Sequence, residues 1–145
     1  MALSLPDPFG FNNRYNTTLQ RLETELEIFI HEIGALAAQE AKAALERGVY
    51  DHPPIRDKKG RVRYRRTGRL RRGEQGPTYG RRGDVLWTKI QNNVRYAVPR
   101  HEMGKPGKKR TQYPAHWHDE AAAKVRKQAV ALGQRVIVRT FGRGQ

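Results

Sequence analysis

The 145-residue chain contains no cysteine and only one serine, Ser4. It therefore has no disulfide framework and no thiol nucleophile, and acyl-enzyme chemistry has almost no candidate residue. No run of apolar residues approaches the roughly 20 that a membrane-spanning helix needs. The first residues lack a basic stretch followed by an apolar run, so we expect no signal peptide. These absences favour a soluble, non-enzymatic protein made in a cytoplasm.

Acidic residues are scarce in the second part of the chain. Residues 1–57 carry 5 Lys and Arg against 9 Asp and Glu, a net charge of −4. Residues 58–145 carry 24 against 5, a net charge of +19, and the whole chain has a net charge of +15. The asymmetry predicts two surfaces with different partners, the basic one facing nucleic acid or an acidic protein.

Apolar residues are also few, at 37% of the chain, with a mean hydropathy of −0.88. We expect a modest core with extended arms. Pro6 and Pro8 exclude regular helix near the start, so residues 1–16 are predicted to be an arm. Residues 17–141 are predicted to form a single domain, and residues 142–145 a flexible tail.

Residues 17–47 show the three-and-four spacing of apolar side chains that is typical of an amphipathic helix. Thr17 and Gln20 fit a capping box at its start, and Gly48 fits its end. A helix of this length would span about 46 Å, more than one small sheet covers. We therefore expect part of it to pack on another subunit, with its glutamates facing solvent.

In the second half of the chain, the sequence predicts strands before and after one more helix. Residues 85–98 resemble a hairpin that turns at Asn92-Asn93, with Trp87 and Tyr96 in the core. A helix is predicted from 118 or 119 to Leu132, followed by a last strand over residues 135–141. The predicted order is one helix, three strands, a helix and a strand. The fold class is α+β: an antiparallel sheet packed by a long N-terminal helix and a C-terminal helix, with extended basic loops.

Residues 51–84 are predicted to be a basic loop. Between residues 56 and 72 the chain has ten Lys and Arg and a single acid. We consider three roles for this loop, in order of preference: contact with an acidic protein, contact with the DNA backbone, and a contribution to solubility alone. No helix-turn-helix or zinc-finger pattern is present, so sequence-specific reading is not expected. The candidate contact residues are Arg61, Arg63, Tyr64, Arg65, Arg66, Arg69, Arg71 and Arg72.

Histidines flank Trp117 on both sides, and His101-Glu102 lies upstream. In a strand, His116 and His118 would share a face and could bind a metal. The favoured interpretation is a buried Trp117 at a helix start, because the spacing matches no metal-binding motif. We therefore assign no catalytic residue, metal ligand or cofactor.

Four segments of the second half resemble motifs of one protein family. Residues 66–72 (RTGRLRR) look like a T-G-x-L-x-x-S segment, and residues 92–97 (NNVRYA) look like an N-x-V-x-Y-A strand. Residues 101–105 (HEMGK) are similar to an E-[FHM]-G-T turn, and residues 113–117 (YPAHW) to a Pro-aromatic segment before a final helix. In this order the segments resemble the HK97 gp10-like head–tail joining proteins of siphophages. The matched positions are Thr67, Gly68, Leu70, Tyr96, Ala97, Glu102 and Gly104.

The resemblance covers roughly residues 17–132 and includes departures. Gly73 stands where the family usually has serine, Pro99 interrupts the end of a strand, and a further strand is predicted after the last helix.

The resemblance implies a structural subunit of a virion, assembled in the host cytoplasm, in a ring at the neck or the top of the tail. The implied partners are further copies of the chain in a six- or twelve-fold ring, the head connector or stopper, and tail-tube or tail-terminator proteins. DNA in the channel is a further candidate partner, and no membrane partner is expected. The alternatives are a nucleic-acid-binding accessory protein without sequence specificity and, third, a metal-dependent nuclease using His116 and His118.

Overall fold

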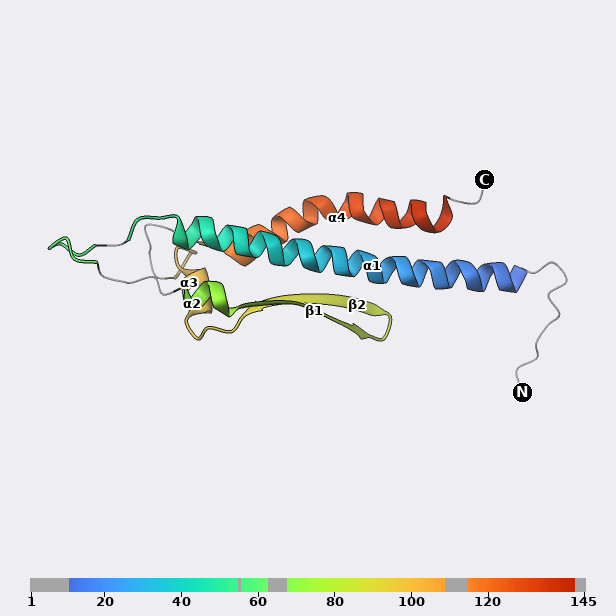
Figure 1. Ribbon diagram of the computed structural model, residues 1–145, viewed down its shortest axis with the longest axis horizontal. Coiled ribbons are helices and arrows are strands. Elements are labelled where there is room, and N and C mark those ends of the chain that lie inside the picture. Colours follow the sequence, from blue (N-terminus) through green and yellow to red (C-terminus); the bar gives the residue numbers. More distant parts are fainter. Residues whose placement is uncertain (1–10, 55, 63–67, 109–114, 143–145) are drawn as a thin grey trace.

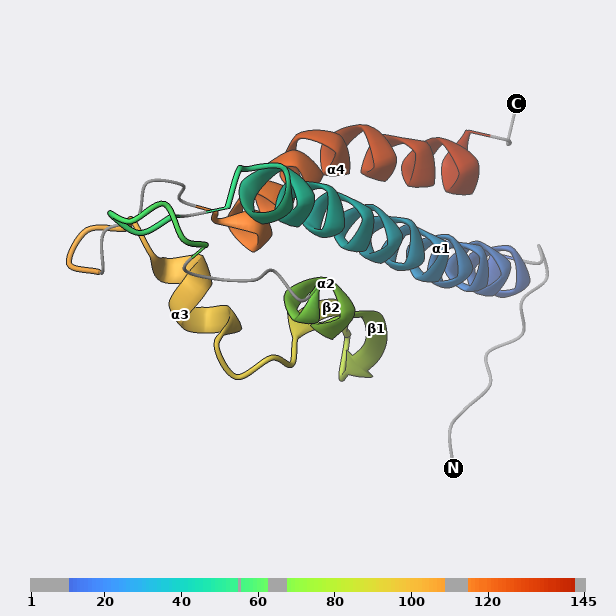
Figure 2. The same cartoon turned by 60° about the vertical axis from the view of Figure 1, so that its left-hand side comes forward.

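The structure is a computed structural model that describes residues 11–54, 56–62, 68–108 and 115–142, and for residues 11–13 the backbone only. The described chain forms three layers, with the long helix α1 between a two-stranded hairpin and the helix α4 (Figure 1). Figure 2 shows the hairpin and α4 on opposite sides of α1. The predicted α+β class is confirmed, although the predicted order of elements is wrong.

Helix α1 spans Phe11–Leu45, and a π-helical turn, η1, continues it over Glu46–Tyr50. Its 35 residues extend about 52 Å. The predicted helix over residues 17–47 is confirmed, but both of its predicted ends are wrong. The helix begins before Thr17, so residues 11–16 do not belong to an arm. Gly48 does not end it: a Cβ there would lie 2.7 Å from the Ala115 Cβ, so this glycine permits close packing.

Strands β1 (Glu74–Arg82) and β2 (Val85–Asn92) pair antiparallel around a turn at Gly83 and Asp84. The predicted hairpin over residues 85–98 is wrong. Its predicted first strand is β2, which pairs with the preceding strand β1 and not with residues 94–98. Gly83 has φ +59°, which suits a tight hairpin turn. The Asn92 side chain donates to the Leu70 carbonyl and accepts from the Val94 amide, which ends β2.

Two short helices flank the hairpin. Helix α2 (Arg69–Gly73) precedes β1, and helix α3 (Ala97–Glu102) follows β2 and contains Pro99. Much of the predicted basic loop over residues 51–84 is therefore helix or strand. The predicted strand 94–98 is a turn leading into α3, and its Tyr96 is 44% exposed, not core.

Helix α4 runs without interruption over Trp117–Phe141, antiparallel to α1 (Figure 1). The predicted helix end at Gly133 and the predicted last strand are both wrong. Leu132, Val136 and Thr140 are buried at intervals of four, which places one face of the helix against the protein. Of the β-branched residues after Gly133, Val136 and Thr140 follow this helical spacing, whereas Ile137 and Val138 are exposed. The described residues 135–141 therefore form helix and not the additional strand.

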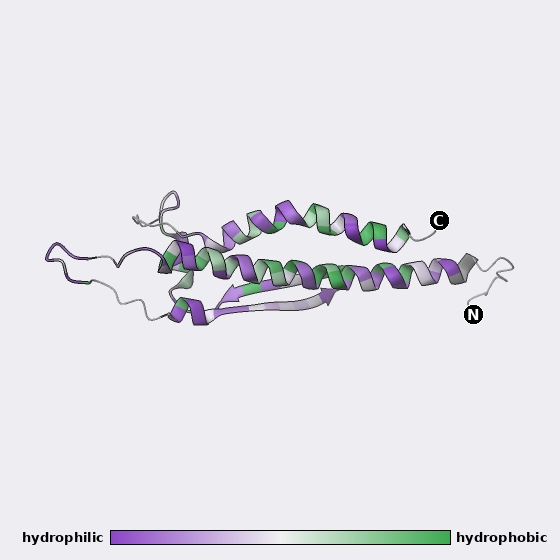
Figure 3. Cartoon of the chain, turned by 45° about the horizontal axis from the view of Figure 1, so that its top comes forward, coloured by the Kyte–Doolittle hydropathy of each residue, from purple (hydrophilic) through white to green (hydrophobic). Residues whose placement is uncertain are grey.

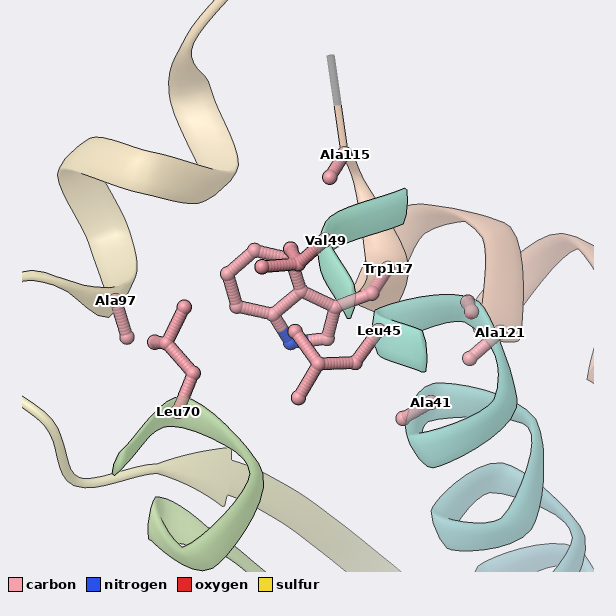
Figure 4. Packing of buried hydrophobic residues seen from close by; sticks show 9 residues of the cluster. Ala41, Leu45, Val49, Leu70, Ala97, Ala115, Trp117 and Ala121 are labelled. Atoms are coloured by element: carbon pink, nitrogen blue, oxygen red, sulfur yellow. The ribbon is translucent and has the colours of Figure 1, made fainter. Parts of the chain in front are cut away.

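The core lies at one end of the molecule, where α1, α2, α3 and α4 meet (Figure 4). Trp117 is 1% exposed and Trp87 is 41% exposed. The predicted burial of Trp117 at a helix start is thus confirmed, and the predicted burial of Trp87 is wrong. The buried cluster consists of Ala41, Ala44, Leu45, Val49, Leu70, Ala97, Ala115, Trp117 and Ala121. Among the described residues, none of the helices combines the length and apolarity that crossing a bilayer requires.

Candidate functional site

Helix α2 presents two of the predicted contact arginines to solvent. It follows Gly68, whose φ of +70° is a conformation that favours glycine. Leu70 turns inward and is buried, whereas Arg69 and Arg72 are exposed. Burial of Leu70 therefore anchors a short helix whose other face is basic.

Arg71 pairs inside its own chain. Its guanidinium forms an ion pair with Glu46 and lies 4.4 Å from the centre of the Tyr50 ring. Its backbone amide donates to the Tyr50 hydroxyl at 3.2 Å. The hydrogen bond to Glu46 raises the pKa of Arg71 above its ordinary value. This arginine therefore ties α2 to the turn η1.

The rest of the predicted basic site is only partly described. Arg61 forms an ion pair with Asp57 at 3.1 Å, beside an isolated bridge between Arg56 and Val62. Five predicted positions lie outside the described residues: Arg63, Tyr64, Arg65, Arg66 and Thr67.

Four of the seven positions that resemble the family motifs are clearly buried or clearly exposed; Gly68 and Glu102 are intermediate, and Thr67 lies outside the described residues. Leu70 and Ala97 pack with Trp117 in the buried cluster (Figure 4). Tyr96 and Gly104 are exposed, and Gly104 has φ +88°. Segments that are separate in sequence therefore meet at the core end of the molecule.

Acids of the first helix pair with bases from the rest of the chain. Glu23 pairs with Arg81 at 2.7 Å, and Glu25 pairs with Arg139 at 3.4 Å. Glu40 also pairs with a base of α4, Lys124. Glu23 remains exposed, as predicted for a solvated face, whereas Glu25, Glu40 and Glu46 are partly buried in their ion pairs. Part of the charge asymmetry is thus neutralised within one subunit.

A histidine cluster lies where α3 meets the start of α4. One potential ligand atom from each of His101, His116 and Asp119 lies within 4.8 Å of the others. The sequence analysis considered His116 and His118 as the pair that could bind a metal. In the structure His118 is not part of the group, and its Nε2 contacts Glu74 instead. The available sequence signal for the group was the spacing of three between His116, the residue that precedes α4, and Asp119 in its first turn.

Lys105 links two carboxylates at this cluster. Its Nζ lies 2.8 Å from Asp119 Oδ2 and 2.9 Å from Glu102 Oε1. The hydrogen bond from Lys105 is the main cause that lowers the pKa of both carboxyls. The same bonds, Asp119 first, raise the pKa of Lys105. The Lys105 ammonium therefore joins the two carboxylates, one from α3 and one from α4.

An apolar surface runs along the far end of α1 and α4. Tyr15, Leu19 and Leu26 are exposed on α1, and Ile137 and Phe141 on α4. Two shallow grooves lie between α1 and α4 here. Figure 3 shows hydrophobic residues along both helices. Sequence reasoning missed the α4 part, since it predicted a strand there. We call this surface the apolar stripe, defined by Tyr15, Leu19, Leu22, Leu26, Phe29, Val130, Ile137 and Phe141.

Comparison with known proteins gives no assignment: neither a family model, nor a curated protein sequence, nor a solved structure matches this chain.

Proposed function

We propose that this chain is a structural subunit of a tailed-bacteriophage virion, one of a ring at the neck or the top of the tail that joins head to tail. The observation that carries the proposal is the meeting of the family-like segments. Leu70, Ala97 and Trp117 come from three such segments and pack in one core cluster. Segments that resemble one family in sequence thus also form one structural unit in space.

The apolar stripe supports assembly into an oligomer. Contiguous exposed apolar surface on a chain with a net charge of +15 is typical of a protein interface. A ring closes through heterologous contacts, in which one patch meets a different patch on the next copy. The N-terminal part of α1 extends beyond the hairpin (Figure 1), and its exposed Tyr15 and Leu19 are accessible to a neighbouring subunit.

Charge pairing between subunits has only a small part in this proposal. Glu23, Glu25 and Glu40 pair with bases of the same chain. Their carboxylates are therefore already neutralised when the subunit folds. The apolar stripe is the stronger candidate for the lateral contact, and the basic helix α2 is left for other partners.

The lateral contact is tested by sedimentation of variants at rising protein concentration. Ile137→Glu introduces a charge at a side chain that is 59% exposed, so the subunit should fold and the oligomer should dissociate. Val85→Glu is the matched control, since Val85 is equally exposed but lies at the hairpin turn. A monomeric wild-type chain at all concentrations would contradict this contact.

The place in the virion is tested by electron microscopy of phage particles that encode the chain. Antibody against the chain should label the junction of head and tail. Nonsense mutation of its gene should leave DNA-filled heads separate from tails. Joined, infectious particles in that mutant would overturn the proposed function.

A second candidate function is binding of nucleic acid without sequence specificity. The observation in its favour is the exposed pair Arg69 and Arg72 on a helix that is held in place by the buried Leu70. Rigidly presented guanidinium groups contact phosphates well. This candidate predicts a small species in solution in place of a ring.

A further inference from the structure

We propose that His101, His116 and Asp119 bind a divalent transition-metal ion, for which Zn²⁺ is the probe. The three side chains come from the end of α3 and the start of α4, and their potential ligand atoms lie within 4.8 Å of one another. This inference is independent of the proposed function and deals with a different surface from the apolar stripe.

His101 is arranged as metal-binding histidines are. Its Nδ1 lies 3.0 Å from Glu102 Oε1, a carboxylate oxygen that accepts the N–H. Its Nε2 is buried, has no hydrogen-bond partner among the described residues, and lies 4.0 Å from Asp119 Oδ1. Metal-binding histidines usually donate their other N–H to a carboxylate or carbonyl in this way. The buried lone pair of Nε2 is therefore available to a cation.

His116 has the same tautomer. Its Nδ1 lies 2.5 Å from the backbone carbonyl of His101. A carbonyl oxygen can only accept, so Nδ1 carries the hydrogen and Nε2 carries the lone pair. Each of the two imidazoles thus uses Nδ1 to hold its ring in place, and in this tautomer Nε2 is the nitrogen that can bind a ligand. His118 stays outside the set because its Nε2 contacts Glu74.

The Lys105 ammonium already pairs with Asp119, one of the three proposed ligands. It bonds Asp119 Oδ2 at 2.8 Å and leaves Oδ1 on the side of His101. A metal ion would be repelled by this ammonium, so binding requires Lys105 to move away. Its side chain is 29% exposed and can reach solvent. Lys105 therefore competes with the metal for Asp119.

The donor set selects the kind of metal. Two imidazoles and one carboxylate suit Zn²⁺ and its neighbours, whereas Mg²⁺ and Ca²⁺ prefer oxygen ligands alone. Zinc bonds of about 2.0–2.2 Å place tetrahedral ligands roughly 3.4 Å apart, so the widest pair must close by roughly 1.4 Å. The Asp119 side chain is 58% exposed and free to adjust. A bound ion would join the end of α3 to the first turn of α4, with water as the fourth ligand.

The test is calorimetric titration of the chelator-treated full chain with ZnCl₂, and separately with MgCl₂. We expect saturable binding of one Zn²⁺ per chain and no binding of Mg²⁺. Asp119→Asn, at an exposed side chain that should not disturb folding, should weaken Zn²⁺ binding by about tenfold or more. Lys105→Gln removes the competing ammonium and should strengthen binding several-fold.

His31→Asn is the matched control, because His31 lies on α1 beside Tyr79 and away from the cluster. It should leave Zn²⁺ affinity unchanged, which separates this site from general binding by surface histidines. Absence of saturable Zn²⁺ binding to the wild-type chain overturns the proposal. So does an Asp119→Asn variant that binds Zn²⁺ as tightly as the wild type.

Discussion

Trp117 and Trp87 are the only tryptophans of the chain, and they lie in opposite environments. Trp117 packs among residues of α1, α2 and α3, while Trp87 lies over Gly80 on the hairpin. Trp117→Ala should lower the free energy of unfolding by about 3–5 kcal/mol, because it opens a cavity in the core. Trp87→Ala should cost about 1 kcal/mol. Urea denaturation followed by circular dichroism measures both, and equal losses would contradict the placement of the core.

Two glycines give a second test at the scale of single residues. A Cβ at Gly34 would lie 2.4 Å from Thr88 Oγ1 and 2.8 Å from Tyr79 Cε1, so this glycine lets the hairpin approach α1 closely. Gly34→Ala should destabilise the fold by about 1–3 kcal/mol through overpacking.

Gly133 provides the matched control for that change. It lies inside α4, and a Cβ there would meet no atom of the described residues within 4 Å. Gly133→Ala should therefore raise the free energy of unfolding by about 0.5–1 kcal/mol, since alanine favours helix over glycine. Thermal unfolding of both variants checks the pair. Destabilisation by Gly133→Ala would favour the predicted helix end at this position.

At the scale of elements, the continuity of α4 has a direct test. Gln134→Pro places a proline in the middle of the helix, where it removes a backbone hydrogen bond and clashes with the preceding turn. We expect a loss of about 3 kcal/mol and reduced helical circular dichroism. Gln134→Ala, which is compatible with helix, should leave both quantities near wild type. A proline variant of normal stability would instead indicate a loop before a strand.

The sequence predicted well those elements whose own residues repeat one pattern. The body of α1 follows from its three-and-four spacing, and burial of Trp117 follows from a large aromatic residue at a helix start. The predicted strand over residues 135–141 is wrong because β-branched residues favour strands only where neighbouring strands provide a pleated surface to pack on. Here Val136 packs with its helical neighbours against α1, and this tertiary contact outweighs local propensity.

The candidate sites depended on contacts between distant segments. Nothing local marks Glu46 as the partner of Arg71, or Glu74 as the partner of His118. The metal-binding group is similar, because His101 and Asp119 come from different helices. Sequence patterns identified the right residue types in these regions, but pairing across the fold decides which of them meet.

At the scale of the whole molecule, the ion pairs change how the charge is distributed. Single exposed pairs stabilise a protein by about 0–1 kcal/mol, so pairs such as Glu23–Arg81 contribute little individually. Together they pair three acids of α1, namely Glu23, Glu25 and Glu40, with bases of the hairpin and α4. The exposed arginines of α2 lie at the opposite end of α1 from the apolar stripe (Figure 1). A subunit with these two ends can contact neighbouring copies at one and a different partner at the other.

The identity of that different partner can be tested through its dependence on charge. A net charge of +15 should produce weak binding of duplex DNA at low salt, with log K falling linearly against log salt concentration. We expect Arg69→Gln with Arg72→Gln to weaken this binding no more than Arg126→Gln with Lys127→Gln. Both pairs of residues are exposed, and both double variants remove two positive charges, so they differ only in position. Equal loss would mean that the DNA responds to overall charge, which leaves an acidic protein as the partner of α2. If only the α2 variant lost affinity, with a salt slope smaller by about 2, α2 would contact phosphates directly and the nucleic-acid function would replace the proposed one.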